Sequence, residues 1–222
     1  MSKGAIRFMR NIHLLPQNKN LVSLHTHIRN KTCSQRDFIF YSKRIIALLL
    51  EKALDFLPYE NIETETPLEK NFSGLKLKHQ EVCGVSILRA GESMEDVLRE
   101  ILPEIPFGKI LIQRNYEKIQ NGTGPLYSSF PSHLSKCHVL LLDPILATGN
   151  TAISSLDLLR EKGVSQEKII FVNLICAPEG IERVFQKFPK ITLVTSSIDD
   201  KLDEKGYIIP GIGDFGDRFL GT

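Results

Sequence analysis

Short apolar runs alternate with amphipathic segments along most of this 222-residue chain, and this alternation limits its fold more than any other feature. Strands are expected in the apolar runs at residues 82–88, 109–113, 139–142, 168–174 and 191–195. Helices are expected at residues 38–57, 93–101, 148–162 and 178–188, where apolar residues recur at helical spacing. Short buried strands separated by helices are typical of parallel sheets covered on both faces. The sequence therefore predicts an α/β protein with a mostly parallel central sheet flanked by helices, in a single domain spanning residues 1–222.

The ends of the first helix and three other segments complete this outline. Asp37 is the expected N-cap of the first helix and Pro58 its stop. Residues 61–81 are polar and are expected to form a loop, and residues 115–136, with their glycines and prolines, a flexible flap. Residues 197–222 are rich in Gly and Asp and predict either a loop that serves a site or a frayed tail. Apolar side chains favour the loop: Tyr207, Ile208, Ile209, Ile212 and Phe215.

Composition excludes several classes of protein. Hydrophobic residues make up 42% of the chain, which suits a sizeable globular core, and no apolar run approaches the ~18 residues that a membrane span needs. The four cysteines lie about 40 or more residues apart, a spacing that fits neither a zinc motif nor a disulfide framework. Separate reduced thiols predict a cytoplasmic protein, and presence in the nucleus is compatible with the sequence.

Charge is distributed unevenly although the formal net charge is only +2. Seven of the 28 basic residues lie in residues 1–36, which contain no acid. This basic N-terminal arm suits a polyanion, a nucleotide effector or an acidic neighbouring subunit, and it also has the composition of a targeting peptide. Its apolar residues favour an arm that packs on the protein: Ile12, Leu14, Leu15, Leu21, Val22 and Leu24.

The most informative segment runs from the buried strand at Val139 into a turn of small residues and then into a helix. Ligands of open α/β sheets collect at the carboxyl ends of strands, where a helix start offers free N–H groups to an anion. Ala147 and Gly149 let the backbone approach a phosphate, and Thr148 and Thr151 add hydroxyl donors. No Gly-Lys-Ser/Thr follows, so a Walker A loop is excluded. The segment predicts a monophosphate site beside a sugar-binding carboxylate, Asp143; an ordinary strand–turn–helix connection capped by Thr148 is the alternative.

Four segments resemble the motifs of type I phosphoribosyltransferases, in the variant typical of the uracil enzymes. They are SILRAGESME at 86–95, IQRN at 112–115, DPILATGNT at 143–151 and PGIGDFGDR at 210–218. Most other members of the wider group carry two adjacent acids where this chain has Asp143 followed by Pro144. The resemblance runs from about Asn11 to the C-terminus and is greatest for the eukaryotic, fungal-type enzymes. It implies the type I fold with an N-terminal arm (1–36) and a C-terminal base-binding hood (197–222).

The resemblance also implies an activity, the transfer of phosphoribose from 5-phosphoribosyl 1-diphosphate (PRPP) to uracil, giving UMP and diphosphate. Catalytic roles are implied for Arg114, Asp143 and Asp214, and the loop at Arg89 in this family often contains a non-proline cis peptide. The implied uracil-binding residues are Tyr207, Ile208, Gly213, Asp214 and Phe215. The implied PRPP-binding residues are Arg89, Ala90, Gly91, Arg114, Asp143, Pro144, Ile145, Leu146, Ala147, Thr148, Gly149, Asn150, Thr151 and Asp214.

Two departures from the family accompany these matches. Asn150 stands where most active members have glycine; asparagine tolerates unusual backbone angles, so the turn is expected to keep its shape. Many members carry paired acids soon after the second arginine, whereas residues 115–118 here read Asn-Tyr-Glu-Lys.

The implied cofactor is Mg²⁺, carried by PRPP without direct side-chain ligands. The family forms dimers or tetramers, and some members respond to GTP, for which Lys31, Arg36 and Arg44 are candidate contacts. No nucleic-acid or membrane partner is expected. Two alternatives remain: a PRPP- or nucleotide-sensing or RNA-binding regulator of the same fold, favoured by the basic arm and Asn150, and a purine phosphoribosyltransferase, opposed by Asp143–Pro144 and the glycine-rich terminal segment.

Overall fold

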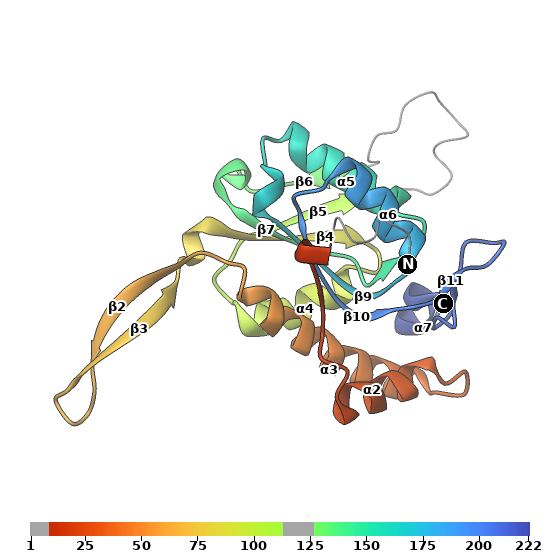
Figure 1. Ribbon diagram of the computed structural model, residues 1–222, viewed down its shortest axis with the longest axis horizontal. Coiled ribbons are helices and arrows are strands. Elements are labelled where there is room, and N and C mark those ends of the chain that lie inside the picture. The colour runs from red at the N-terminus through yellow and green to blue at the C-terminus, as the bar shows by residue number, and fades with distance from the viewer. Residues whose placement is uncertain (1–8, 113–126) are drawn as a thin grey trace.

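The chain folds into a central sheet with helices on both faces and two small hairpins, as the computed structural model in Figure 1 shows; it describes residues 9–112 and 127–222. The helices are α2 (Lys19–Arg29), α3 (Gln35–Leu54), α4 (Glu92–Ile101), α5 (Asn150–Glu161), α6 (Pro178–Lys187) and α7 (Phe215–Leu220). The strands are β1 (Ile12–Leu14), β2 (Tyr59–Glu65), β3 (Asn71–Leu77), β4 (Val82–Leu88), β5 (Phe107–Leu111), β6 (Tyr127–Ser129), β7 (His138–Leu142), β8 (Ile145–Leu146), β9 (Ile169–Cys176), β10 (Thr192–Ile198), β11 (Lys201–Leu202) and β12 (Ile208–Ile209).

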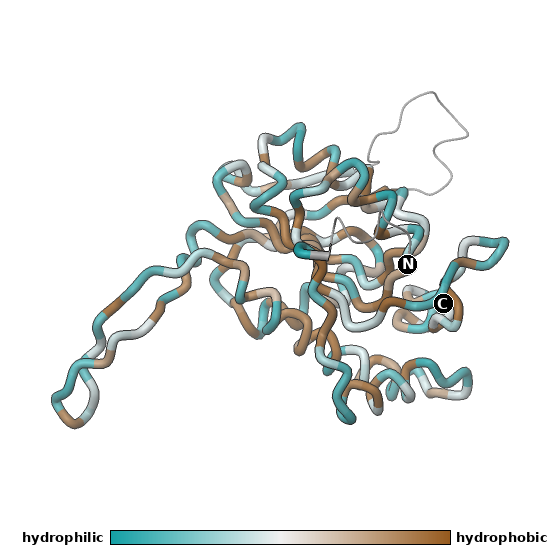
Figure 2. The backbone as a smooth tube through the Cα atoms, in the orientation of Figure 1, coloured by the Kyte–Doolittle hydropathy of each residue, from teal (hydrophilic) through white to brown (hydrophobic). Residues whose placement is uncertain are grey.

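The main sheet has the strand order β1-β10-β9-β7-β4-β5-β6, with β8 paired to β9. Its pairs are parallel except for the antiparallel edge pair of β5 and β6. Alternate side chains of each strand point to opposite faces. In β7, Leu140 and Leu142 pack with the core under α3 and α4, whereas Val139 and Leu141 pack with the core under α5 and α6. Figure 2 shows the resulting apolar centre, and the predicted α/β class is confirmed.

Two predicted helix starts are wrong by a few residues. The N-cap of α3 is Ser34, whose hydroxyl accepts a hydrogen bond from the Asp37 amide at 3.1 Å. Asp37 therefore lies inside the first turn, where its charge favours the positive end of the helix dipole. The helix α5 begins at Asn150 rather than at Thr148, because residues 145–146 form strand β8 and Gly149 turns the chain.

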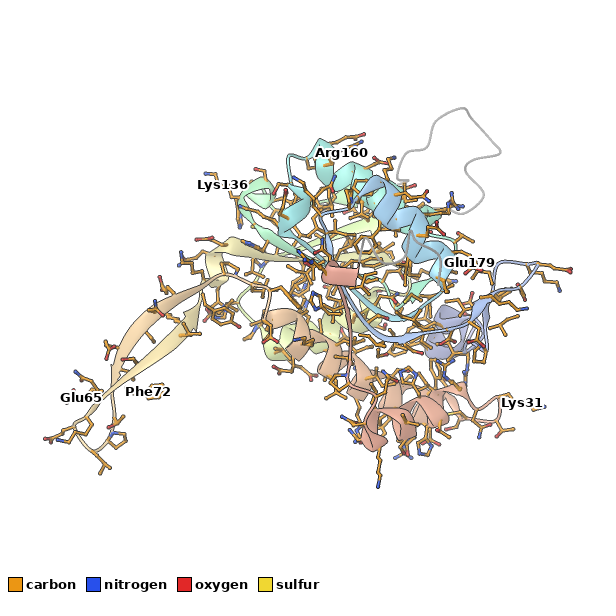
Figure 3. The ribbon with its side chains drawn as sticks, viewed as in Figure 1. Lys31, Glu65, Phe72, Lys136, Arg160 and Glu179 are labelled. Atoms are coloured by element: carbon orange, nitrogen blue, oxygen red, sulfur yellow. The ribbon has the colours of Figure 1, made fainter. Side chains whose placement is uncertain are left out.

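Residues 59–77, expected to be mostly loop, form the antiparallel hairpin β2–β3. The hairpin extends away from the sheet, and Figure 3 shows Glu65 and Phe72 far from the body of the protein. Leu68, Phe72 and Leu75 are all more than 60% exposed. The sequence therefore lacks the one-sided apolar pattern by which a half-buried strand is recognised.

The N-terminal arm packs on the protein over its described part. Strand β1 pairs with β10, and α2 buries Leu21, Leu24 and Ile28 against α3. Leu14 and Val22, expected to pack, are instead 44% and 49% exposed. Residues 12–29 thus form part of the sheet and of one helix layer.

The C-terminal segment is folded, so the interpretation as a frayed tail is wrong. It contains the hairpin β11–β12 and helix α7, and it buries Ile208, Ile212 and Phe215. In the part of the chain that the structure describes, no helix is both long and apolar enough to cross a membrane.

Candidate active site

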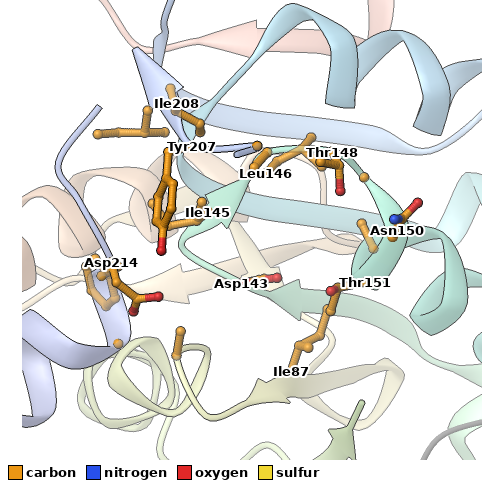
Figure 4. A pocket seen from close by; sticks show the side chains of 18 of the residues that line it. Ile87, Asp143, Ile145, Leu146, Thr148, Asn150, Thr151, Tyr207, Ile208 and Asp214 are labelled. Atoms are coloured by element: carbon orange, nitrogen blue, oxygen red, sulfur yellow. The ribbon is translucent and has the colours of Figure 1, made fainter. Parts of the chain in front are cut away.

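A pocket of about 720 Å³ lies where β4, β7 and β8 end, and the C-terminal segment closes one side of it. Figure 4 shows Asp143, Thr151, Tyr207 and Asp214 around this space. The predicted site residues that line it are Arg89, Ala90, Asp143, Ile145, Leu146, Ala147, Thr148, Gly149, Asn150, Thr151, Tyr207, Ile208, Gly213, Asp214 and Phe215. Gly91 and Pro144 do not line it, and Arg114 lies outside the described residues. Fifteen of the residues predicted from the sequence thus line one pocket.

The turn before α5 has the features of an anion site. Gly149 has φ = 82° and occupies the N-cap without any side-chain hydrogen bond to the first turn of α5. That turn contains no acidic residue, so the positive end of the helix dipole faces the pocket uncompensated. The guanidinium of Arg183 donates to the Thr148 carbonyl oxygen at 3.0 Å and holds the turn from behind.

A glycine in α6 allows this turn to lie where it does. A Cβ atom at Gly180 would fall 2.2 Å from the Ala147 carbonyl oxygen, so a larger residue would push the turn away. Gly180 was not predicted as a site residue; its signal in the sequence is a glycine inside a helix, where glycine is unfavourable without a packing reason.

Asn150 has an ordinary helical backbone. Among the described residues, Glu69 is the one non-glycine residue with positive φ. The unusual angle expected at Asn150 falls on Gly149 instead, so Asn150 serves simply as the first residue of α5.

The loop after β4 carries an exposed arginine. The peptide bond between Leu88 and Arg89 is cis, as the family resemblance implies. The Arg89 side chain is 64% exposed, and its nearest acid, Asp217, lies 3.8 Å away. Gly91 supports the loop from below, because a Cβ atom there would lie 2.3 Å from the Leu142 carbonyl oxygen. A solvent-accessible cation that lines the same pocket as the start of α5 suits an anionic group.

Asp143 and Pro144 follow β7 at the floor of the pocket. Asp143 is 9% exposed, its amide donates to Val172, and its carbonyl oxygen accepts from the Asn173 side chain at 3.1 Å. The Pro144 carbonyl oxygen accepts from the amides of Leu174 and Ile175. Asp143 is therefore held at the pocket, while Pro144 fastens the turn to β9.

Glycines shape the part of the C-terminal segment that faces the pocket. Gly211 has φ = 59°, and a Cβ atom there would fall 2.0 Å from the Ile208 carbonyl oxygen. Phe215 anchors the segment, because its ring lies 5.4 Å from those of Phe38 and Phe219. Asp214 caps α7 by accepting from the Asp217 amide at 3.0 Å. The glycines thus shape a narrow turn that lines the same pocket as the start of α5.

A buried ion pair, missed from the sequence, holds this segment in place. Arg29 donates to both carboxylate oxygens of Asp199 at 2.7 Å and to the Gly211 carbonyl oxygen at 2.9 Å. Asp199 also accepts from Ser197 and from the Gly211 amide. Burial alone would raise the pKa of the Asp199 carboxyl, but these hydrogen bonds outweigh burial and lower it. Gly211 is therefore fixed through both its N–H and its C=O.

Lys205 and Gly206, also missed, line the pocket from the hairpin β11–β12. A Cβ atom at Gly206 would lie 3.5 Å from the Thr148 methyl group, so this hairpin lies beside the turn that precedes α5. Lys205 adds a second cation to the pocket wall.

The sheet topology and the pocket at the strand ends are those of the type I phosphoribosyltransferase fold. The fold is shared with adenine phosphoribosyltransferase from Trypanosoma brucei, at 13% identity and a TM-score of 0.56, with 92% of this chain and 88% of that one covered. The chain belongs to the uracil phosphoribosyltransferase family, whose profile matches residues 15–222.

Two further comparisons concern the sequence and the fold. The chain is 47% identical over 210 residues to the uracil phosphoribosyltransferase of Saccharomyces cerevisiae, with 95% of this chain and 96% of the yeast protein covered. The structure of the AQ2163 protein from Aquifex aeolicus matches with a TM-score of 0.80 at 30% identity, covering 95% of this chain and 98% of that one.

Proposed function

We propose that this chain forms UMP and diphosphate from uracil and PRPP through the residues gathered at its strand ends, as an enzyme of pyrimidine salvage. The observation that carries the proposal is the uncapped, acid-free start of α5 at Gly149, which shares one pocket with the glycine turn at Gly211–Gly213. The first suits a sugar phosphate, and the second suits a planar base.

The 5-phosphate of PRPP is assigned to the turn at Thr148–Thr151. Backbone N–H groups at the start of α5 and the two threonine hydroxyls supply donors for the phosphate oxygens. Asp143 is assigned to the ribose hydroxyls, because it is held at the tip of β7 beside that turn.

The diphosphate of PRPP is assigned to Arg89 and the adjoining backbone of Ala90. Arg114, implied by the family resemblance, is assigned the same role. Mg²⁺ carried by the diphosphate fits this region, since Asp143 and Asp214 offer carboxylate oxygens that can accept hydrogen bonds from waters on the ion. When bound to the diphosphate, the ion supplies neutralising charge for the leaving group.

The proposed reaction is a displacement at the anomeric carbon. The bond between C1 of the ribose and the diphosphate oxygen breaks, the bond from uracil N1 to C1 forms, and the N1 proton is lost. Arg89 stabilises the charge that develops on the departing diphosphate. Asp214 orients the reacting end of PRPP, and positioning by the two walls of the pocket supplies the remaining rate enhancement.

Base selection is assigned to main-chain groups of Ile208, Gly213 and Phe215, with Tyr207 covering the base. Uracil presents two carbonyl acceptors around one N3–H donor, a pattern that backbone N–H and C=O groups match. Cytosine would place an amino group against a donor, and such a buried mismatch is costly.

Regulation and assembly extend the proposal. Lys31 and Arg36 are exposed at the α2–α3 connection, and Arg44 is exposed further along α3, where its guanidinium lies 3.4 Å from the Asn20 side chain near the start of α2. These three cations are the proposed GTP contacts. Exposed apolar residues of the β2–β3 hairpin, such as Phe72, support a homodimer or homotetramer.

The test is UMP formation from labelled uracil with PRPP and Mg²⁺, using Asp143→Asn and the matched surface control Asp96→Asn. Asp96 is 63% exposed on α4, so its variant should behave as wild type. The Asp143 variant should lose about 100-fold or more in kcat/KM. Absence of UMP from the wild type, or equal rates in the two variants, refutes the proposal.

The regulator and the purine enzyme are separated by the same preparation. Tight PRPP binding without UMP, or RNA binding that weakens with salt, would favour the regulator. Competition by adenine or guanine, rather than by uracil analogues, would favour a purine enzyme.

A further inference from the structure

Two of the four cysteines lie side by side at the amino ends of β4 and β7, away from the active-site pocket at the carboxyl ends of these strands. Cys83 is the second residue of β4 and Cys137 directly precedes β7; their Sγ atoms lie 2.8 Å apart, and both residues are fully buried. The sequence suggested isolated thiols because 54 residues separate the two. The strands β4 and β7 are adjacent and parallel, however, so their amino ends lie side by side.

A histidine completes a group of three soft ligands. His133 lies four residues before Cys137, and the ligand atoms of Cys83, His133 and Cys137 all lie within 4.8 Å of one another. The residues between His133 and Cys137 form a tight turn, in which the Cys137 thiol lies 3.6 Å from the His133 carbonyl oxygen. His133 is exposed and lines a surface hollow of about 750 Å³, so its imidazole is accessible to an ion in solvent.

We propose that Cys83, His133 and Cys137 bind one Zn²⁺ ion, with water as the fourth ligand. Zinc favours sulfur and nitrogen ligands in a tetrahedron, whose bond lengths place ligand atoms about 3.5 Å apart. The two Sγ atoms lie 2.8 Å apart and the three ligand atoms lie within 4.8 Å of one another, so small shifts would reach this spacing. The exposed imidazole of His133 can move toward the two thiols. Two thiolates and a neutral imidazole leave the zinc complex without net charge, which suits the apolar surroundings of Val85, Leu134 and Val139.

The ion would fasten the turn at residues 133–137 to the start of two strands. The opposite ends of β4 and β7 carry Arg89 and Asp143, so the site is structural and lies away from the chemistry. Burial and the adjacent Cys137 thiol raise the pKa of the Cys83 thiol. Zinc binds cysteine as the thiolate, so binding should release protons and the apparent zinc affinity should fall as the pH decreases.

The test is a titration of the fully reduced, full-length protein with Cd²⁺, followed by the thiolate-to-metal absorption band, and with Zn²⁺ against a chromophoric chelator. The expected stoichiometry is one ion per chain, with release of protons on binding. His133→Ala should weaken zinc binding by at least about tenfold. The matched control, His27→Ala, removes another exposed histidine and should leave affinity unchanged.

Two cysteine variants complete the test. Cys137→Ser should abolish the thiolate band, whereas Cys33→Ser, which alters a thiol outside the cluster, should preserve it. Because Cys137 is buried and its variant is at risk of not folding, the exposed His133 decides the outcome independently. Absence of a thiolate band in reduced protein, a disulfide that persists in reductant, or equal affinities for the two histidine variants overturns the proposal.

Discussion

Replacing Asp199 by asparagine is expected to have two effects. It should loosen the turn at Gly211–Gly213, which is assigned to uracil, and it should lower the stability of the protein. The Asp199 side chain is 3% exposed and its partner Arg29 is 23% exposed. Removing one member of a buried ion pair costs about 3–5 kcal/mol, and the water that still reaches Arg29 favours the lower end, about 3 kcal/mol. The asparagine amide would also present its NH₂ group to a donor, either the Arg29 guanidinium or the Gly211 N–H.

The effect on catalysis follows from Gly211. Arg29 and Asp199 hold its two backbone groups, and the turn that they fix contains Gly213, assigned to uracil. Suppose that the substitution raises the free energy of the uracil-binding conformation of this turn by only about 1.4 kcal/mol relative to its other conformations. The binding conformation then becomes about tenfold less populated, and the apparent affinity for uracil falls by the same factor. The KM for uracil should rise by about that factor, while the KM for PRPP should change less.

The assay combines urea unfolding with steady-state kinetics on Asp199→Asn, Arg29→Lys and Asp200→Asn. Asp200 is the exposed neighbour and serves as the matched control. Arg29→Lys keeps the charge but loses the two-pronged contact, so its effects should be intermediate. Because the pKa of Asp199 is lowered in the folded state, its contribution is present above about pH 4 and is lost as the pH falls further. A stability within about 0.5 kcal/mol of wild type and an unchanged KM for uracil would refute this reasoning.

Three further predictions concern His25, Gly91 and Asn150. Burial, then the nearby Arg29, lowers the pKa of His25 to about 4, so the unfolded chain takes up the proton first as the pH falls. The free energy of unfolding should drop by about 2 kcal/mol between pH 7 and pH 5, and clearly less in His25→Gln, as measured by urea unfolding at both pH values. Gly91→Ala places a methyl group 2.3 Å from a backbone oxygen and should raise the KM for PRPP at least about tenfold, whereas Ser23→Ala, at an exposed position on α2, should not. Asn150→Gly should leave kcat within about twofold and lower the melting temperature slightly, because a helix position gains a glycine; a large gain in kcat would show that Asn150 impairs the turn.

Much of the sheet was predictable because its strands are apolar on both faces. Residues 82–88 form β4 with the expected bounds, and the strand at Val139 differs by one residue at its start. The hairpin β2–β3 was not predictable, since its side chains face solvent and its pairing leaves no apolar pattern. The three-residue strand β1 was equally hidden, because its pairing partner β10 lies 181 residues further along the chain.

The candidate site likewise has features that could be predicted from the sequence and features that could not. Local chemistry at the strand tips identified the turn at Thr148 and the loop at Arg89, because both combine small residues with anion-binding groups. Contacts between distant segments could not be found this way: Arg29 and Asp199 are 170 residues apart, and each alone resembles an ordinary surface charge. The close pair Cys83 and Cys137 was hidden for the same reason, although the spacing of His133 and Cys137 was a usable local signal.

The anion-binding role of the turn at Thr148–Thr151 is the claim on which the assigned reaction depends. Its most direct test is an amide ¹⁵N–¹H NMR titration of the protein with UMP. The account predicts that the amides of Gly149, Asn150 and Thr151 show the largest shifts, and that inorganic phosphate at higher concentration reproduces them. Saturable UMP binding that leaves these amides unmoved would contradict it.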